Sequence, residues 1–372
     1  MTDSYEIRRY EPADRDGFLA LFEEVLGGEM GAEWFAWKYE QNPYVDHVPI
    51  VVAERDSGSN SDSELVGARA FFPLTVAAGT DRYDAFQPCD SMVHPDHQRQ
   101  GIFTRMTERA LEWYDDVDLF FNFPNHRSLP GNLELGWEIV STQETYYRVQ
   151  NPAIWLSQPW PVESVARALA RGYTSVRDRL ADSTGGFDVV RHDHVPPTVL
   201  SMLAGSETVS QFHVVRDETF YEWRFENPHW SYRTVVATHA ETPVAAVVYG
   251  RRERTSGSTT VRIVDVLPLA DTERSLDSNS RRTAALSRLL DDILRTNEDA
   301  DVVVAPGGVI PRSVLNARGF HSDSRAPLRW ISSSSTHVVR PAGANPSDWT
   351  RSGRRLTDES NWRLALCEVD SA

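Results

Sequence analysis

Hydrophobic and polar positions in residues 5–150 repeat with two different periods, which predicts strands alternating with helices. Residues 5–10 alternate like a strand, and Pro12 begins a helix whose apolar face contains Leu19, Phe22 and Leu26. Further runs predict helices at 33–39 and 102–113, and strands at 50–54, 65–72, 83–93, 119–123 and 146–149. This order predicts an α/β fold with a twisted mixed sheet flanked by helices.

The second half of the chain repeats landmarks of the first. Four pairs of segments match: 37–43 with 223–228, 51–53 with 235–237, 93–95 with 266–268, and 135–137 with 318–320. We therefore expect two tandem units, at 1–150 and 186–372, joined by a connector at 151–185 that contains an amphipathic helix at 165–180. The alternating segment 361–366 is expected to be the last strand of the second sheet. The other interpretation is that it brings Glu368 and Asp370 towards the first unit's cleft.

The segment from Val93 to Trp113 combines a strand end, a polar turn and an amphipathic helix with apolar residues at Ile102, Met106 and Ala110. Gly101 stands at the mouth of the helix, where the missing Cβ lets a ligand approach the backbone. The N–H groups of the first turn have no acceptor within the helix, so they suit a pyrophosphate. Ordinary strand–turn–helix units share this property.

The loop Gln98-Arg99-Gln100-Gly101-Ile102-Phe103 resembles the acetyl-CoA loop of the GNAT acetyltransferases, usually Gln/Arg-x-x-Gly-x-Gly/Ala. Phe103 departs from the small residue usual at its position. Leu135-Gly136-Trp137 is similar to the family's Leu-Gly-Phe, and the order of elements in residues 4–150 is the GNAT order. The resemblance implies that the strand at 117–125 splays from the one before it to admit pantetheine. It also implies that Met92, Val93 and Asn125 bind the cofactor together with the six loop residues.

The second unit lacks this signature. Residues 269–276 have no glycine at the helix mouth, and their acidic side chains would repel a pyrophosphate. We expect a degenerate unit that supports the first, so that one acetyl-CoA site serves the chain. The tandem arrangement resembles acetyltransferases of the enhanced-intracellular-survival type. Those proteins carry a third domain, which residues 331–372 are too few to supply.

The resemblance implies acyl transfer from a thioester to an amine. Backbone N–H groups at Met92 and Val93 would stabilise the oxyanion, and a base would take the proton of the amine. Asp90 and His94 are the candidates for the base. The alternatives are a capping carboxylate for Asp90 and a solvated rim residue for His94, and both alternatives fit the sequence better.

Two further positions bear on the acceptor and on the leaving group. The family's usual acid, a tyrosine, is replaced by Asn132, for which water, Tyr146 or Tyr147 would substitute. Trp34 is the candidate for acceptor binding because the aromatic stripe at 34–39 borders the acceptor site in GNATs. The alternative for this stripe is core packing, which the repeated residues at 223 and 225 favour for Trp37 and Tyr39.

Composition sets outer limits on the function. The chain has 372 residues, of which 40% are hydrophobic, and a mean hydropathy of −0.44. No run approaches the ~20 apolar residues of a membrane span, and the start lacks the features of a signal peptide, so we expect a cytoplasmic protein. Two cysteines, Cys89 and Cys367, indicate neither a disulfide framework nor a metal cluster, and we expect no metal.

The net charge of −16 argues against general affinity for nucleic acid or acidic membranes. Only one of the 38 basic residues, Lys38, is a lysine. An acidic chain with almost no lysine resembles the cytosolic proteins of salt-loving archaea. A negative surface would also attract cationic amines.

We therefore expect an acetyl-CoA-dependent N-acetyltransferase that acts on an amine of a small molecule. One alternative enzyme resembles the FemX-type tandem transferases that take aminoacyl-tRNA, against which the charge and the loop weigh. An alternative from another class is a non-catalytic acyl-CoA-binding sensor, which the missing tyrosine keeps open. The sequence leaves the acceptor and the oligomeric state open.

Overall fold

The computed structural model contains two compact units. It describes residues 5–28, 30–55, 64–152, 172, 177, 186–206, 208–254, 257–269, 276–326, 328–330, 334–343 and 345–370. Unit 1 contains residues 1–141, 226–228 and 336–361, and unit 2 contains residues 142–225, 229–335 and 362–372. Neither unit is continuous in sequence. The predicted boundaries at 150 and 185 stay a prediction about domains.

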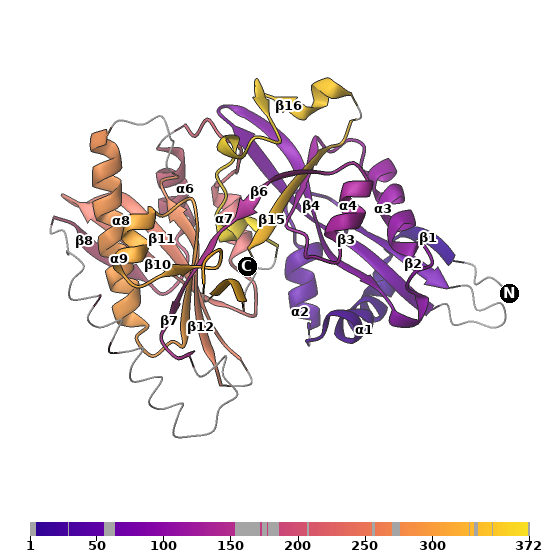
Figure 1. Ribbon diagram of the computed structural model, residues 1–372, viewed down its shortest axis with the longest axis horizontal. Coiled ribbons are helices and arrows are strands. Elements are labelled where there is room, and N and C mark those ends of the chain that lie inside the picture. Colours follow the sequence, from indigo (N-terminus) through magenta and orange to yellow (C-terminus); the bar gives the residue numbers. More distant parts are fainter. Residues whose placement is uncertain are drawn as a thin grey trace. The chain divides into compact units, whose positions relative to one another are not determined.

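The first sheet has the main order β1-β2-β3-β4-β5-β15-β6 (Figure 1). Only β4 and β5 are parallel among the pairs β1–β2, β2–β3, β3–β4, β4–β5 and β5–β15. Its strands are β1 (Tyr5–Arg9), β2 (Ile50–Arg55), β3 (Glu64–Ala78), β4 (Asp81–Val93), β5 (Leu119–Asn122), β6 (Glu138–Gln143) and β15 (Ser335–Pro341). Its helical elements are η1 (Pro12–Asp14), α1 (Arg15–Leu26), α2 (Ala32–Phe35), the π-helical turn η2 (Ala36–Glu40), η3 (Pro95–His97), α3 (Ile102–Trp113) and α4 (Leu129–Glu134). After β15 come η6 (Pro346–Trp349), the hairpin β16 (Thr350–Arg351) and β17 (Arg354–Arg355), and η7 (Glu359–Asn361).

Helical elements cover both faces of the first sheet because successive side chains of a strand point to opposite faces. On β3, Phe72 contacts Trp37 of η2, whereas Gly67 faces Ile102 and Met106 of α3. The predicted apolar face of α1 is partly wrong, since Leu26 is exposed. Phe18, Leu21 and Phe22 are the buried residues of α1, because this side of the helix packs against β3 and β4.

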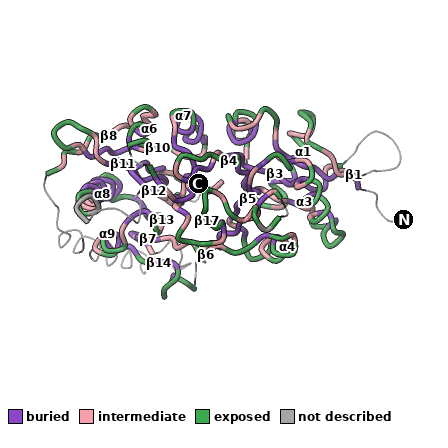
Figure 2. The backbone as a smooth tube through the Cα atoms, turned by 90° about the horizontal axis from the view of Figure 1, so that it is seen from above, coloured by how far each residue is buried: buried purple, intermediate pink, exposed green. Residues whose placement is uncertain are grey.

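The second sheet has the order β14-β7-β13-β12-β11-β10-β8. Its strands are β7 (Thr145–Val149), β8 (Asp188–His192), β10 (Ser231–His239), β11 (Thr242–Glu253), β12 (Thr259–Leu267), β13 (Val302–Pro306) and β14 (His321–Ser322). Other elements of this half are α6 (Pro197–Gly205), β9 (His213–Val214), α7 (Glu218–Arg224), α8 (Leu276–Thr296), α9 (Arg312–Ala317), η5 (Leu328–Trp330) and η8 (Leu366–Glu368). Figure 2 shows the middle strands as buried; all five residues of β13 and all four of β5 are buried.

The two sheets have the same strand order once their elements are matched. β8, β10, β11, β12, β13, β7 and β14 take the places of β1, β2, β3, β4, β5, β15 and β6. The α/β prediction of two similar mixed-sheet folds is confirmed.

The predicted role of the strand at 146–149 is wrong. The strand belongs by prediction to the unit at 1–150 and so to its sheet, but β7 pairs with β13 and β14 in the second sheet. The corresponding place in the first sheet, beside β5, is taken by β15 from the C-terminal part of the chain. Pairing partners this distant in sequence leave no local pattern, so periodicity predicted the strand and missed its sheet.

The predicted last strand at 361–366 is also wrong. This segment makes one isolated bridge, between Trp362 and Phe212, and then the short helix η8. Glu368 is buried in unit 2, where Oε1 lies 3.0 Å from Arg216. The predicted connector helix at 165–180 lies outside the described residues except for residues 172 and 177, as does the loop at 270–275. None of the described helices has the length and apolar character needed to cross a membrane.

Candidate active site

β4 and β5 separate within the first sheet. Their parallel pairing covers only Ala85 with Leu119 and Phe86 with Phe120. Beyond these pairs β4 continues for seven residues to Val93 without pairing to β5. The predicted splay is present, and it leaves backbone groups of β4 without a strand partner on the β5 side.

The loop from Gln98 to Gly101 leads from this free part of β4 into α3. Gly101 precedes the helix with φ 76°, a left-handed conformation that favours glycine, and Arg99 also has a positive φ of 61°. The first turn of α3 has no acidic residue, and the Arg99 side chain is exposed. Free N–H groups, the helix dipole and an adjacent guanidinium together suit a phosphate.

Side chains of β1 and of the loop itself hold this loop in place. The Tyr5 hydroxyl donates to Gln100 Oε1 at 3.0 Å and lies 2.9 Å from His97 Nδ1. Gln98 Nε2 donates to the Val93 carbonyl at 3.2 Å. Gln98 and Gln100 therefore use these side-chain atoms to hold the loop, and the Gln98 backbone N–H also donates within it, to the Pro95 carbonyl at 3.4 Å.

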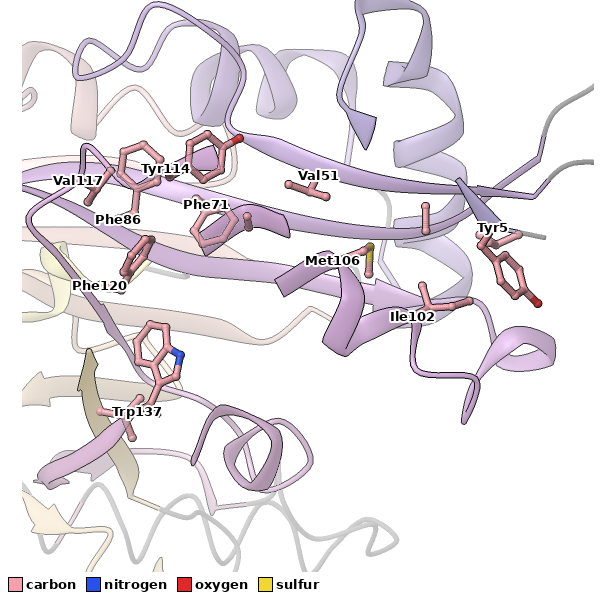
Figure 3. Packing of buried hydrophobic residues seen from close by; sticks show 14 residues of the cluster. Tyr5, Val51, Phe71, Phe86, Ile102, Met106, Tyr114, Val117, Phe120 and Trp137 are labelled. Carbon is pink, nitrogen blue, oxygen red and sulfur yellow. The ribbon is translucent and has the colours of Figure 1, made fainter. Parts of the chain in front are cut away.

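Packing fixes the direction of α3. Ile102 and Met106 enter the same buried cluster as Tyr5, Phe71 and Phe120 (Figure 3). A Cβ on Gly67 of β3 would meet both Ile102 and Met106 at 3.2 Å, so the helix lies close against the strand. Ile102 is thus a core residue whose backbone N–H belongs to the first turn.

The backbone of Val93 points towards the splay. His94 N–H donates to Val66 O of β3 at 2.9 Å, and the N–H groups of a strand alternate in direction. The N–H of Met92 therefore faces β3, where Met92 is paired with Ala68, whereas the N–H of Val93 faces away from β3. Of the two predicted oxyanion donors, Val93 has the suitable direction.

Asp90 lies at an irregularity in β4. The β3–β4 register shifts between Ala68 and Ala70, and Asp90 has a φ of 41°. Its Oδ2 lies 2.6 Å from Lys38 Nζ and accepts a very short hydrogen bond from the Tyr39 hydroxyl. Burial, followed by the charge of Asp90, raises the pKa of Tyr39 well above its usual value, so this hydroxyl keeps its proton.

His94 has both ring nitrogens engaged. Nδ1 accepts from the Asp96 backbone N–H at 3.2 Å, and Nε2 lies 2.8 Å from Glu24 Oε1. In the neutral ring this pattern puts the proton on Nε2, which leaves no free lone pair for general-base work. The geometry favours Asp90 over His94 among the two predicted bases.

Trp34 and Asn125 have local partners. Trp34 is buried between Phe22 and Tyr39, with ring centroids at 5.2 and 5.9 Å, and Lys38 Nζ lies 5.1 Å from its ring. Asn125 Oδ1 accepts from two backbone N–H groups ahead of α4, those of Arg127 at 2.9 Å and Ser128 at 3.1 Å. The ligand roles predicted for these two residues remain predictions.

Arg69 is a residue of this region that the sequence did not predict. It lies on β3 with a side chain 1% exposed, and it donates a very short hydrogen bond to Ser91 Oγ of β4. A second nitrogen lies 3.5 Å from Asn132 Oδ1 of α4. The guanidinium carbon lies 4.9 Å from the ring centroid of Phe103, so the residue that departs from the loop pattern covers this arginine.

The corresponding region of the second unit is a closed ionic network. Arg216 Nε lies 3.0 Å from Asp265 Oδ1 of β12, Arg216 Nη1 lies 3.0 Å from Glu368, and Tyr221 donates to Asp265 Oδ2 at 2.9 Å. The Arg216, Asp265 and Glu368 side chains are at most 1% exposed.

Tyr146 and Tyr147, predicted as substitutes for the missing acid, belong to β7 of the second sheet.

The sequence matches one family model, described as an acetyltransferase (GNAT) domain, over residues 6–140. The likeness to the GNAT family is therefore shown for residues 6–140. The match covers α3, the loop before it, and the separated strands β4 and β5. No curated protein matches the sequence.

Solved structures resemble most of the chain. A GCN5-related N-acetyltransferase from Anabaena variabilis is 10% identical with a TM-score of 0.60, over 91% of this chain and 73% of that one. Eis1 from Mycobacterium abscessus is 16% identical with a TM-score of 0.51, over 91% and 74%. N-myristoyltransferase from Saccharomyces cerevisiae, solved with bound myristoyl-CoA and inhibitors, is 12% identical with a TM-score of 0.58, over 97% and 87%. At these identities the likeness shows the fold.

Proposed function

We propose that this protein transfers an acyl group from a coenzyme A thioester, acetyl-CoA in the first instance, to an amine of a small molecule. The observation that carries the proposal is the separation of β4 from β5 next to the Gly101 end of α3. These features offer a slot for an extended pantetheine and an anion site for the pyrophosphate at one end of it.

Residues of the loop and of the end of β4 would each bind a different part of coenzyme A or support the residues that do. The backbone at Gly101, Ile102 and Phe103 would hold the pyrophosphate, and Arg99 would add a positive charge. The Val93 N–H would bind the thioester oxygen as it becomes an oxyanion. Met92 contributes as a buried residue that fixes the neighbouring strand.

Asp90 is the proposed base. Its described hydrogen bonds from Lys38 and Tyr39 reach Oδ2, and Oδ1 accepts none from the described residues. Oδ1 would take a proton from the incoming ammonium directly or through one water. The amine then attacks the thioester carbon, the C–N bond forms, and the C–S bond breaks with its electron pair on sulfur. The nitrogen gives its second proton to water, which leaves a neutral amide and the thiolate.

The length of the acyl chain is the open part of the proposal. The yeast relative was solved with a myristoyl chain on coenzyme A, whereas the match over residues 6–140 is to an acetyltransferase domain. Phe103 fills space beside Gly131, where an added Cβ would lie 3.2 Å from the Phe103 ring, so α3 and α4 are closely packed. The family match is the observation that favours an acetyl group.

Calorimetric titration of acetyl-CoA and myristoyl-CoA in high salt tests the donor, and thiol release with a panel of amines tests the transfer. We expect one acetyl-CoA site per chain and amine-dependent thiol release. Binding without release for any amine would favour an acyl-CoA sensor, and transfer only from aminoacyl-tRNA would favour a FemX-like enzyme. The absence of acyl-CoA binding would overturn the proposal.

A further inference from the structure

Arg69 is a buried cation without an acidic partner among the described residues. Its hydrogen bonds go to two neutral groups, the Ser91 hydroxyl and the Asn132 amide oxygen. Nε of Arg69 and Nδ2 of Asn132 are both buried without a hydrogen-bond partner in the described structure. A buried charge is ordinarily paired, because removing it from water costs several kcal/mol, on the order of the net stability of a protein.

Three other buried arginines have ionic partners or backbone carbonyl partners within hydrogen-bond distance. Arg216 is paired with Asp265 and Glu368, and Arg318 lies 2.6 Å from Asp291. Arg282 donates to two carbonyl oxygens, those of Pro268 at 2.7 Å and Val309 at 2.8 Å. Burial lowers the pKa of Arg69 to about 10, which still leaves it charged at neutral pH. The contrast with Arg216 and Arg318, together with the unpartnered Nε, makes Arg69 a candidate for an anion that arrives from outside the protein.

The position of Arg69 indicates which part of a ligand it would contact. Ser91 lies in the part of β4 that has separated from β5, and Asn132 lies on α4, the helix that follows β5. The guanidinium therefore bridges the two sides of the slot proposed for pantetheine. Phe103 and Phe71 flank it, with ring centroids at 4.9 and 5.9 Å, and these rings exclude water on the α3 side.

Asp90 and Ser91 are consecutive, and their side chains contact different elements. Asp90 meets Lys38 and Tyr39 of η2, and Ser91 meets Arg69. Successive side chains of a strand point to opposite faces of the sheet. The proposed base and the buried cation therefore lie on either side of one backbone segment, as the attacking nitrogen and the departing sulfur of an acyl transfer require.

We propose that the Arg69 guanidinium, together with the Asn132 amide, stabilises the thiolate of coenzyme A as it leaves the acyl group. The inference rests on the proposed function. When the C–S bond breaks, the electron pair remains on sulfur next to the guanidinium. The thiolate leaves with the product or takes a proton from water. A cation within contact distance lowers the pKa of a thiol by about one to three units.

The test compares the affinity of coenzyme A with that of desulfo-coenzyme A, which lacks the sulfur, by calorimetry at about pH 6 and about pH 9. In the wild type, the ratio of the two affinities should rise with pH, by roughly 8-fold if the thiol pKa is lowered by about one unit and by more if it is lowered further, because the bound thiol ionises more readily than the free thiol. Arg69→Met should flatten the ratio and leave affinity for desulfo-coenzyme A unchanged. Arg69→Lys should restore part of the rise.

Asn132→Asp provides a second test in case Arg69→Met does not fold. The new carboxylate is the same size as the amide and pairs with Arg69, so the pH-dependent rise should also be lost. Arg282→Met, which removes a buried arginine of the other unit, should keep the rise. A flat ratio in the wild type, or a full rise in Arg69→Met, would overturn the inference. Failure of the wild type to bind desulfo-coenzyme A would instead overturn the proposed function.

Discussion

The Nζ atom of Lys38 lies 2.6 Å from Oδ2 of Asp90, so the only lysine of the chain is paired with the proposed base. The Lys38 side chain is 2% exposed and that of Asp90 is 13% exposed. The pair orients the carboxylate, and the residual exposure leaves an approach for an acceptor. In the second unit, Asp265 makes a similar pair with Arg216 but is fully buried, so no acceptor could reach it.

Asp90→Asn should reduce kcat by about 10²- to 10⁴-fold while the affinity for acetyl-CoA changes little, because the amide cannot accept a proton. Asparagine tolerates the left-handed conformation of Asp90, so the strand should keep its shape. Steady-state kinetics and calorimetry would measure the two effects. Asp96→Asn, which changes an exposed carboxylate nearby, is the matched control. An unchanged kcat in Asp90→Asn would assign Asp90 a structural role.

Gly101→Asp should weaken coenzyme A binding at least ~10-fold, because it adds bulk and negative charge where the pyrophosphate is proposed to bind. The φ of 76° also makes any side chain there strained by about 1 kcal/mol. Calorimetry and circular dichroism would separate binding from folding. Gly79→Asp is the control, since Gly79 has a φ of 63° in the β3–β4 turn and open space around it. Wild-type affinity in Gly101→Asp would contradict the site.

The sequence predicted the loop and the splay because both follow from local features, a strand end, a glycine and an amphipathic helix. The buried position of Arg69 was not predicted, because a charged residue within a strand ordinarily indicates a solvent-facing position. Its flanking residues, Ala68 and Ala70, are both fully buried, and a cation between small residues in an apolar strand was the available signal. For Lys38, the signal was its being the single lysine of the chain.

The positions of β7 in the second sheet and of β15 in the first sheet could not be predicted for a different reason. Each strand has the expected alternation, and alternation does not say which of two similar sheets a strand joins. Only the pairing of Val338 with Asn122 and of Tyr147 with Val304 distinguishes the two arrangements. The contacts that decide it lie more than 150 residues apart in the chain.

Val338→Asp should unfold the first sheet. Val338 is fully buried in the cluster that contains Phe71 and Phe120, and a carboxylate there would lose its hydration, so we expect a loss of more than about 4 kcal/mol. Hydrogen exchange should show faster exchange in β5 and β6 than in β11 and β12. Val190→Asp, on an exposed position of β8, should have little effect. Preserved protection of β5 in Val338→Asp would contradict the placement of β15.

His337 of β15 should make the first sheet sensitive to acid. Burial lowers the pKa of His337 to about 3, whereas the unfolded chain has a histidine pKa of about 6.5. Between these values the unfolded state binds a proton that the native state does not, so stability is present above about pH 6.5 and falls as pH falls. The slope is about 1.4 kcal/mol per pH unit within that window.

Replacing His337 with phenylalanine should remove this slope. The His337 ring stacks on Phe123 with centroids 5.2 Å apart, and a phenyl ring can take the same place without titrating. Urea unfolding of the two proteins at about pH 7, 6 and 5 would give the difference in stability directly. His213, whose pKa burial lowers to about 4, contributes in the same direction to both proteins and cancels in the comparison. Parallel pH profiles for wild type and His337→Phe would show that His337 accepts its proton without disturbing the sheet.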